Sequence, residues 1–585
     1  MSDLLQHAPT NQKFLADITR FIIELEDRIK QLPFFQSAKA AGTLTARESG
    51  EFFTQAIQAM EEAYSRDLNA YSAMRWMYYF RRTPNAVFAG DLTSTCPNAR
   101  ALAEVYANRS VRLESAAYGR KGFVFPVNES TLRHIARFIA FINIIYDLQV
   151  GFKLASKEYS FTFPTERNRV PGRLTKGALA FRPMASPAPT TLPSRVSDPI
   201  LENAVRMYDQ RHDSHGRTFH GAALNQAGLA HDESANNAVN TDVNFAQAYW
   251  GLLSDEIAVA PQEFLKGHPR AADYGSAGKV LIRFRPSTLD LAKIFELHRA
   301  PALEKQDIEP NASLCLLVLL IAGRYLQRSR YSILRIMELG YFIMPFNEWN
   351  MLGEKVYDAV CDEVRQHLPQ FQAPASFEAF SSSCLSFLGE VWPAAHGAPA
   401  RKTNDNMCID MWAASMGFLA WFNIPKRQGK VANERAAKFE DVVQQRIDRT
   451  RWADNNIREL RQRTLKVAGQ AVTDIDAIGS FEGTLLLVSC KSIPYSREYD
   501  QGVHSVIRNA ASTVNSGVST WVTIVNRLSE NPSGDNFDFT NYERIVGVVC
   551  TPFAVYTSDE QALSTSVGTL RWACSLDELI AFLKC

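Results

Sequence analysis

The sequence predicts a two-part protein of the α plus α/β class, with a large, mainly helical N-terminal region followed by a C-terminal mixed β-sheet flanked by helices. A chain of 585 residues is long enough for about two to four compact units. Apolar residues recur mainly at helical spacing before Pro425, and strand-like apolar runs are frequent after it. The predicted units are 1–162 (helical domain), 163–240 (linker or long loops with a short helix), 241–425 (mainly helical middle domain) and 426–585 (mixed-sheet domain).

The bulk composition is that of a globular protein. Hydrophobic residues make up 46% of the chain and charged residues 21%, which excludes wholesale disorder. The formal net charge is +1, so binding of nucleic acid would need local clusters of Lys and Arg. Nine cysteines are scattered without a CxxC pair, which indicates reduced thiols rather than a disulfide framework or a zinc site.

The chain shows no predicted export signal or membrane span. The start MSDLLQHAPTNQKFLADITR lacks the basic residues and apolar run of a secretory signal. The two most apolar stretches, Leu314–Gly323 and Met411–Ile424, are shorter than the roughly 20 residues that a span needs. We therefore expect buried helices there, and a soluble cytoplasmic protein that does not engage a membrane.

The first 162 residues are predicted to be helical. Apolar side chains at positions 14, 18, 21, 22, 25 and 29 alternate with polar ones at the spacing of an amphipathic helix. The same pattern continues over Glu51–Tyr79, Ala101–Ala117 and Thr131–Leu154, with prolines between segments.

A change of composition marks the predicted linker. Phe163–Pro199 is rich in Pro, Ser, Thr and Arg, which favours turns and extended backbone. Arg211–Asn240 is rich in His, Asn, Asp and Gly, but its histidines have neither regular ligand spacing nor cysteine partners, so solvated loop histidines are favoured over a zinc site. These histidines are His212, His215, His220 and His231.

The middle region combines one strand-like run with further helices. The run KVLIRFRP begins at Lys279, and helices are predicted over Leu289–Phe295, Ala312–Tyr341 and Trp349–Leu368. Neither GxxxxGK[ST] nor GxGxxG occurs between a strand and a helix, so ATP-driven chemistry is not predicted.

The last quarter of the chain alternates helix and strand patterns. A helix, ERAAKFEDVVQQRID, precedes three strand-like runs, another helix and two more runs, which predicts a mixed sheet. The predicted elements after the first helix are strands Thr464–Gly469, Ala471–Gly479 and Thr484–Lys491, a helix Gln501–Val514, and strands Trp521–Val525 and Arg544–Tyr556.

The stretch AVTDIDAIGSFEGTLLLVSCKS predicts an antiparallel hairpin. A two-residue loop at 482–483 would set Asp476 opposite Ser489 and Asp474 opposite Lys491, and a four-residue loop would shift the pairing by two residues. Because side chains alternate with period two, either loop puts these four residues on one face of the sheet.

Two carboxylates beside an ammonium suit hydrolysis of phosphodiesters. Hard carboxylate oxygens hold Mg²⁺, the metal acidifies a bound water, and the lysine stabilises developing negative charge. The alternative is a set of solvent-facing charges on an edge strand. The apolar runs LLLV and VGVV favour central strands instead, where a lysine needs a partner.

These motifs resemble the PD-(D/E)XK nuclease superfamily, whose pattern is an Asp near one strand end and then (Asp/Glu)-x-Lys on the next strand. Here the pattern reads Asp476 and then Ser489-Cys490-Lys491. Glu440, in KFEDVV, has the place of the family's helical metal ligand, and IVGVVCTPFAVYT looks like its late core strand. The resemblance covers about the last quarter of the chain and implies a restriction-endonuclease-like domain with Mg²⁺ or Mn²⁺ as cofactor.

The resemblance implies catalytic roles for Asp476, Lys491, Glu440 and Ser489, and metal ligation by Asp476, Glu440 and Asp474. One departure is Ser489, which stands where the family has Glu or Asp, and a hydroxyl is a weak ligand for a hard cation. Three outcomes are open: Glu440 and Asp474 supply the missing charge, the site binds metal weakly yet cuts, or the domain has become a binding module.

A basic segment gives independent support for nucleic-acid binding. Lys426–Lys466 holds twelve Lys or Arg against six Asp or Glu, a charge excess that could neutralise phosphates. A solvated helix face is the alternative. The candidate contacts are Lys430, Arg435, Lys438, Arg446, Arg449 and Arg451.

The sequence thus predicts a metal-dependent nuclease, with DNA favoured over RNA as the substrate. By analogy with bacterial restriction and anti-phage proteins, the helical region would serve in recognition or regulation, or it would bind a partner protein or form a homo-oligomer. The alternative is a non-catalytic module that binds nucleic acid or protein through a degenerate nuclease fold.

Overall fold

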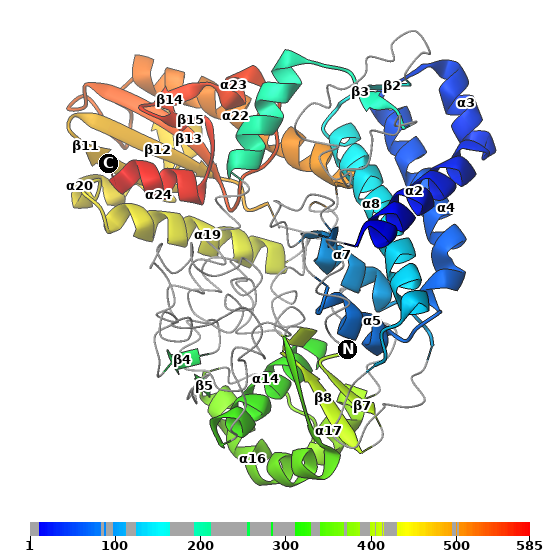
Figure 1. The fold of residues 1–585 in the computed structure, drawn as a ribbon. Helices are drawn as coiled ribbons and strands as arrows, with labels where there is room; N and C mark the ends of the chain where they lie inside the picture. Colours follow the sequence, from blue (N-terminus) through cyan, green and yellow to red (C-terminus); the bar gives the residue numbers. More distant parts are fainter. Residues whose placement is uncertain are drawn as a thin grey trace.

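The chain is a mixed helix and sheet protein in its computed structural model (Figure 1), as the sequence predicts at this level. The structure describes residues 11–83, 87–88, 98–112, 125–163, 192–211, 254–257, 282–284, 310–328, 340–367, 371–385, 398–403, 405–411, 413–414, 430–493, 499 and 502–584.

The N-terminal region is a helical bundle, as predicted. The first predicted helix is confirmed as α2, and its six apolar positions are all buried. Asn11 caps it by accepting a hydrogen bond from the Phe14 N–H, and a capping box between Thr45 and Glu48 starts α4. The helices here are α2 (Gln12–Lys30), α3 (Pro33–Ala41), α4 (Ala46–Leu68), α5 (Ala73–Phe80), α7 (Asn98–Ala107) and α8 (Glu129–Ala155).

Two predicted helix boundaries in the bundle are wrong. The single helix predicted over Glu51–Tyr79 is two helices, because Ser72 caps a new one by accepting the Arg75 N–H. The helix predicted over Ala101–Ala117 ends at Ala107 in a turn, and residues 113–117 lie outside the described part.

α8 is long and apolar enough to span a membrane by length and composition alone. About two thirds of its apolar window, 67%, is buried inside the protein, where α8 packs against α2 and α4. This is the environment of a core helix and is compatible with the predicted soluble protein.

The predicted linker contains regular structure at its end. β3 (Ser194–Arg195) pairs with β2 (Phe161–Thr162), which pairs with β1 (Thr43–Leu44), and a helix follows over 199–211. Residues 164–191 and the histidine-rich loop after 211 lie outside the described residues.

The middle region has a sheet that the sequence did not predict. β6 (Tyr341–Pro345), β8 (Asn406–Asp410) and β7 (Ala400–Thr403) form an antiparallel sheet in that order. Tyr341 therefore begins a strand, and its predicted place at a helix end is wrong. The predicted helix Trp349–Leu368 is confirmed as α16, whereas the predicted helix Leu289–Phe295 lies outside the described residues. The other elements are α14 (Pro310–Arg328), α17 (Phe377–Leu385), and the paired β4 (Ser254–Ile257) and β5 (Ile282–Phe284).

The C-terminal region is a three-layer unit around a four-stranded sheet (Figure 1). One face of the sheet packs on the helices α19 and α24, and the other packs on α22. The strand order is β11-β12-β13-β16, with the first pair antiparallel and the others parallel. The sheet and its helices are β11 (Ala477–Phe481), β12 (Thr484–Cys490), β13 (Arg544–Thr551), β16 (Ala573–Ser575), α19 (Lys430–Asp448), α22 (His504–Glu530) and α24 (Leu576–Lys584).

Smaller elements surround this sheet. β9 and β10 form a two-stranded sheet of their own, and so do β14 and β15. Their bounds, with those of two short helices, are β9 (Thr464–Val467), β10 (Gln470–Asp474), β14 (Thr565–Val567), β15 (Leu570–Arg571), α20 (Asn455–Arg458) and α23 (Glu560–Leu563).

The strand predicted over Trp521–Val525 is wrong, because these residues belong to α22. Its buried residues continue at spacings of three and four to Leu528. β-branched residues suggest a strand locally, but burying one helical stripe against the sheet outweighs that propensity.

The bundle and the C-terminal unit share a hydrophobic core. Tyr499, Phe553 and Tyr556 belong to the same buried cluster as the bundle helices. The Tyr556 N–H donates to the Tyr499 hydroxyl at 2.8 Å, and the Tyr556 hydroxyl donates to the Lys157 carbonyl at 3.0 Å. Tyr499, which lies between Lys491 and α22 in the sequence, and Tyr556 are therefore packed near the end of α8.

A buried ion network joins the bundle to the middle sheet. The Arg81 guanidinium, with 2% of its side chain exposed, lies 2.8 Å from Glu104 Oε2 and 2.9 Å from Asp410 Oδ2. Asp410 is itself 1% exposed. Arg81 is the cation that both carboxylates contact in this buried site, and the charge of the buried Arg401 also acts on them.

Arg81→Met should lower the free energy of unfolding by about 3–5 kcal/mol, because it leaves buried carboxylates without their cation. Chemical denaturation measures the change. Arg47→Met is the control, since Arg47 pairs with Glu51 on the surface, and should cost no more than about 0.5 kcal/mol. Equal effects of the two substitutions would contradict the assignment.

Candidate active site

The predicted hairpin register is confirmed for Asp476. β11 pairs with β12 through Ala477 opposite Val488, which sets Asp476 opposite Ser489 one residue further. The loop is the two-residue one, and Glu482 and Gly483 have φ of 44° and 70°. Two consecutive positive φ values are typical of the tight turn that matches strand twist.

Asp474 does not have its predicted partner. It ends β10, where it pairs with Thr464 of β9, so it does not lie opposite Lys491 in the hairpin. The chain bends between the two aspartates, where β10 ends and β11 begins in another sheet. Asp474 still lines the same cavity as Asp476, Ser489 and Lys491, but it does not share a sheet face with them as predicted.

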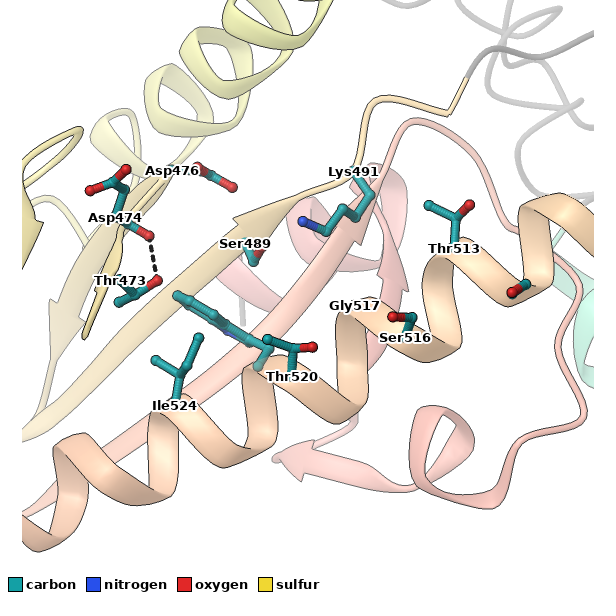
Figure 2. A pocket seen from close by; sticks show the side chains of 12 residues that line it. Thr473, Asp474, Asp476, Ser489, Lys491, Thr513, Ser516, Gly517, Thr520 and Ile524 are labelled. Atoms are coloured by element: carbon teal, nitrogen blue, oxygen red, sulfur yellow. Dashed lines mark hydrogen bonds between the residues drawn. The ribbon is translucent and has the colours of Figure 1, made fainter. Parts of the chain in front are cut away.

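A cavity of about 710 Å³ lies between the end of the hairpin and α22. Figure 2 shows Lys491 and Ser489 projecting toward it from the β12 side, with Asp476 beside them and α22 opposite. Its lining residues are Thr473, Asp474, Asp476, Ser489, Lys491, Ser512, Thr513, Ser516, Gly517, Thr520, Trp521 and Ile524.

The alternation of β12 decides which side chains enter the cavity. Leu486 and Val488 pack toward α19, whereas Leu485 and Leu487 pack toward α22. Ser489 continues the second series and is 8% exposed. Lys491 is the next residue of that series and reaches the same side.

Asp476 accepts a backbone hydrogen bond and has a raised pKa. Its Oδ2 accepts the Cys490 N–H at 2.6 Å. Burial raises the pKa of Asp476 above its ordinary value, although hydrogen bonds from Cys490 and Ser489 and the charge of Lys491 oppose the rise. The negative charge of Asp474 raises it further.

Glu440 lies on α19, close enough to Asp476 for the charge of Asp476 to affect its pKa. Burial raises the pKa of Glu440, and the charge of Asp476 is the second cause. A hydrogen bond from the Gln462 side chain partly offsets these effects. The structure thus brings the predicted helical carboxylate toward the hairpin, although Glu440 is not among the residues lining the cavity.

The donor set fits a hydrated Mg²⁺ better than a metal enclosed by protein ligands. Within the described residues, no three His, Cys, Asp or Glu side chains are grouped closely enough to hold a metal ion by themselves. Mg²⁺ commonly uses one or two carboxylates and completes its shell with water and substrate phosphate oxygens. Asp476 would be the main ligand, with Glu440 or Asp474 as the second.

Gly517 makes room for Lys491, a role that the sequence analysis missed. A Cβ at position 517 would lie 3.1 Å from Lys491 Cε and 3.7 Å from Val549 Cγ1. Glycine costs a helix interior about 1 kcal/mol relative to alanine, so its presence inside α22 needs a compensating contact. The available signal was a glycine within a helical pattern.

The predicted nucleic-acid contacts do not line the cavity. Lys438 and Arg449 are exposed, and Arg451 stacks on the Phe481 ring at 4.2 Å. Arg446 is half-buried, and the side chains of Lys430 and Arg435 lie outside the described part. Their role in binding stays a prediction.

Part of the basic excess is neutralised locally. Three further arginines of the segment form ion pairs with acidic neighbours, which favours a structural role for those three. Arg458 and Arg463 are solvated, whereas Arg461 is mostly buried and also donates to the Asp476 carbonyl at 2.8 Å. The pairs are Arg458 with Asp448 at 2.8 Å, Arg461 with Asp441 at 2.6 Å, and Arg463 with Glu459 at 3.6 Å.

Comparison of the chain with protein-family models, with curated proteins and with solved structures finds no match.

Replacing either of the two carboxylates with a raised pKa by a neutral amide should stabilise the fold at pH 7. Because the pKa of both Asp476 and Glu440 is raised in the folded state, folding becomes less favourable as pH rises through these pKa values. Asp476→Asn should therefore add on the order of 1 kcal/mol at neutral pH, and Glu440→Gln should add less because solvent screens the half-exposed Glu440; both gains should vanish below the ordinary carboxylate pKa.

Thermal denaturation between pH 4 and pH 8, with and without Mg²⁺, measures this effect. Mg²⁺ should raise the Tm of the wild type more than that of either variant, because a bound cation favours the ionised carboxylates that burial disfavours. Glu459→Gln, which changes an exposed carboxylate, is the control. Loss of stability in both site variants at pH 7 would show that ionisation of these carboxylates does not oppose folding.

Proposed function

We propose that the chain is a metal-dependent nuclease whose active site is the cavity at the end of the β11–β12 hairpin. The observation that carries this proposal is the convergence of Asp476, Ser489 and Lys491 on that cavity, with Glu440 electrostatically coupled to Asp476. The three-layer unit, with a hairpin leading into a β-α-β crossover, supports the resemblance to the PD-(D/E)XK superfamily.

Each residue has a chemical task in this proposal. Asp476 accepts the Cys490 N–H at Oδ2 and would be the carboxylate that holds the cation. Bound Mg²⁺ or Mn²⁺ would supply an acidified water and charge stabilisation at the phosphate. The Lys491 ammonium would stabilise the negative charge that develops on the phosphate oxygens.

Ser489 supports Asp476 rather than replacing the missing acid. Its hydroxyl hydrogen-bonds to the Asp476 carboxylate and favours the charged form. A nearly buried hydroxyl at this point leaves one fewer negative charge around the cation, so we expect weaker metal affinity than an acidic residue would give.

The same observation favours the second candidate function, a non-catalytic module that binds nucleic acid. DNA as substrate, a role in bacterial anti-phage defence, and a partner protein or self-assembly through the helical region remain expectations from the family resemblance.

Asp476→Ala and Lys491→Ala should each lower cleavage at least about 100-fold, because each removes a charge used at the reacting phosphate. The assay follows plasmid, linear duplex, single-stranded DNA and RNA with Mg²⁺ or Mn²⁺. Lys584→Ala, at an exposed position on α24, is the control and should cut like the wild type. A folded wild type that cuts nothing with either metal would favour the binding module.

Gly517→Ala should separate activity from stability. The new methyl group displaces the end of Lys491, and we expect a loss of cleavage of about 10- to 100-fold. Removing a helix glycine should meanwhile preserve stability or raise it by up to about 1 kcal/mol.

Gly50→Ala, in α4, is the matched control, because a Cβ there meets nothing within 4 Å. It should give the same gain in denaturation experiments with unchanged cleavage. Full activity in Gly517→Ala would show that the position of Lys491 does not depend on this glycine.

A further inference from the structure

The wall of the cavity that faces the charged cluster is a row of hydroxyls on α22. Ser512, Ser516 and Thr520 are exposed and follow one another at intervals of four residues, so they lie on one side of the helix. With a rise of about 1.5 Å per residue, neighbouring members of this hydroxyl row are about 6 Å apart along the axis. Figure 2 shows Ser516 and Thr520 on the turns of α22 that face the strand carrying Ser489 and Lys491.

These three hydroxyls are available to a ligand. The neighbouring Thr513 hydroxyl donates to the Asn509 carbonyl at 2.9 Å and is therefore occupied. For the hydroxyl row, by contrast, no hydrogen bond to another described residue is found.

The charges of the cavity limit what the ligand can be. Its charged lining residues are two aspartates and one lysine, so without a cation the cavity disfavours an anion. Neutral hydroxyl donors add hydrogen bonds to phosphate oxygens without requiring an additional positive charge, and Ser and Thr are common contacts to nucleic-acid backbones. The row also runs along the helix, which suits a chain of phosphates better than a single one.

We propose that one strand of the nucleic acid runs along α22, with successive phosphates hydrogen-bonded to Ser512, Ser516 and Thr520 while the reacting phosphate lies at Lys491. This inference rests on the proposed nuclease function and adds the path of the substrate strand. The hydroxyl row contacts the phosphate backbone of the nucleic acid rather than its bases, so binding is independent of the base sequence.

Hydroxyl contacts leave a distinct signature in the salt dependence of binding. Each phosphate neutralised by a cationic side chain contributes about −0.7 to the slope of log K against log salt for a single strand, because counterions are released. A hydroxyl contact releases none. Removing hydroxyls should therefore weaken binding by the same factor at every salt concentration and leave the slope unchanged.

The test measures fluorescence anisotropy of a labelled 20-nucleotide single strand, as DNA and as RNA, with the full chain and Ca²⁺ in place of Mg²⁺. The double variant Ser516→Ala/Thr520→Val should bind the preferred polymer about tenfold more weakly with an unchanged salt slope. Ser519→Ala/Thr523→Val makes the same substitutions at exposed positions of α22 outside the cavity lining and should bind like the wild type.

The outcomes separate this inference from the proposed function. If the wild type cuts and the Ser516/Thr520 variant binds and cuts equally well, the strand path is wrong and the nuclease assignment stands. If the variant binds weakly but no chain cuts, the strand path stands without catalysis. Equal losses in both double variants, or a changed slope in the first, would attribute the effect to the helix as a whole and overturn the role of the hydroxyl row.

Discussion

The close packing of α22 against the central sheet is the constraint on which the candidate site depends. Gly547 of β13 lets the Trp521 and Val525 side chains approach, since a Cβ there would lie 2.4 Å from Val525 Cγ2. One turn earlier in α22, Gly517 lies against Lys491. The helix thus buries one stripe in the core and turns its hydroxyl row toward the carboxylates. If α22 packed less closely on the sheet, the cavity would be wider and Lys491 would lose its contact with Gly517.

The same packing connects the site to the rest of the chain. Lys491 directly follows β12, and Ile493 packs against both the core of the bundle and the core beneath α22. His504, at the start of α22, lies 3.2 Å from Glu158 just beyond α8. The bundle therefore contacts a residue at each end of the connection between β12 and α22.

How far the sequence predicts the structure depends on whether a feature is encoded locally. The hairpin register and the meeting of Asp476 with Ser489 follow from two-residue periodicity and a turn that needs positive φ at Glu482 and Gly483. Asp474 was misplaced because it ends β10, which pairs with β9 in a separate sheet, and alternation alone cannot reveal where one strand ends and the next begins. Trp521 was assigned to a strand from local propensity, although the stripe from Ile507 to Leu528 has helical spacing. Arg81 and Asp410, 329 residues apart, offered no local signal for their buried pair. The hydroxyl row could not be recognised as a candidate site from the sequence, because only the fold shows the cavity that it lines.

The most direct test of the account is the position of a bound cation. Anomalous diffraction from crystals of the full chain grown with Mn²⁺ should show a peak beside the Asp476 carboxylate, on the side of Glu440 or Asp474 and within reach of a phosphate at Lys491. A well-ordered site with no peak there at saturating Mn²⁺, or a peak only at distant carboxylates, would contradict the metal-dependent nuclease and leave the cavity as a binding groove.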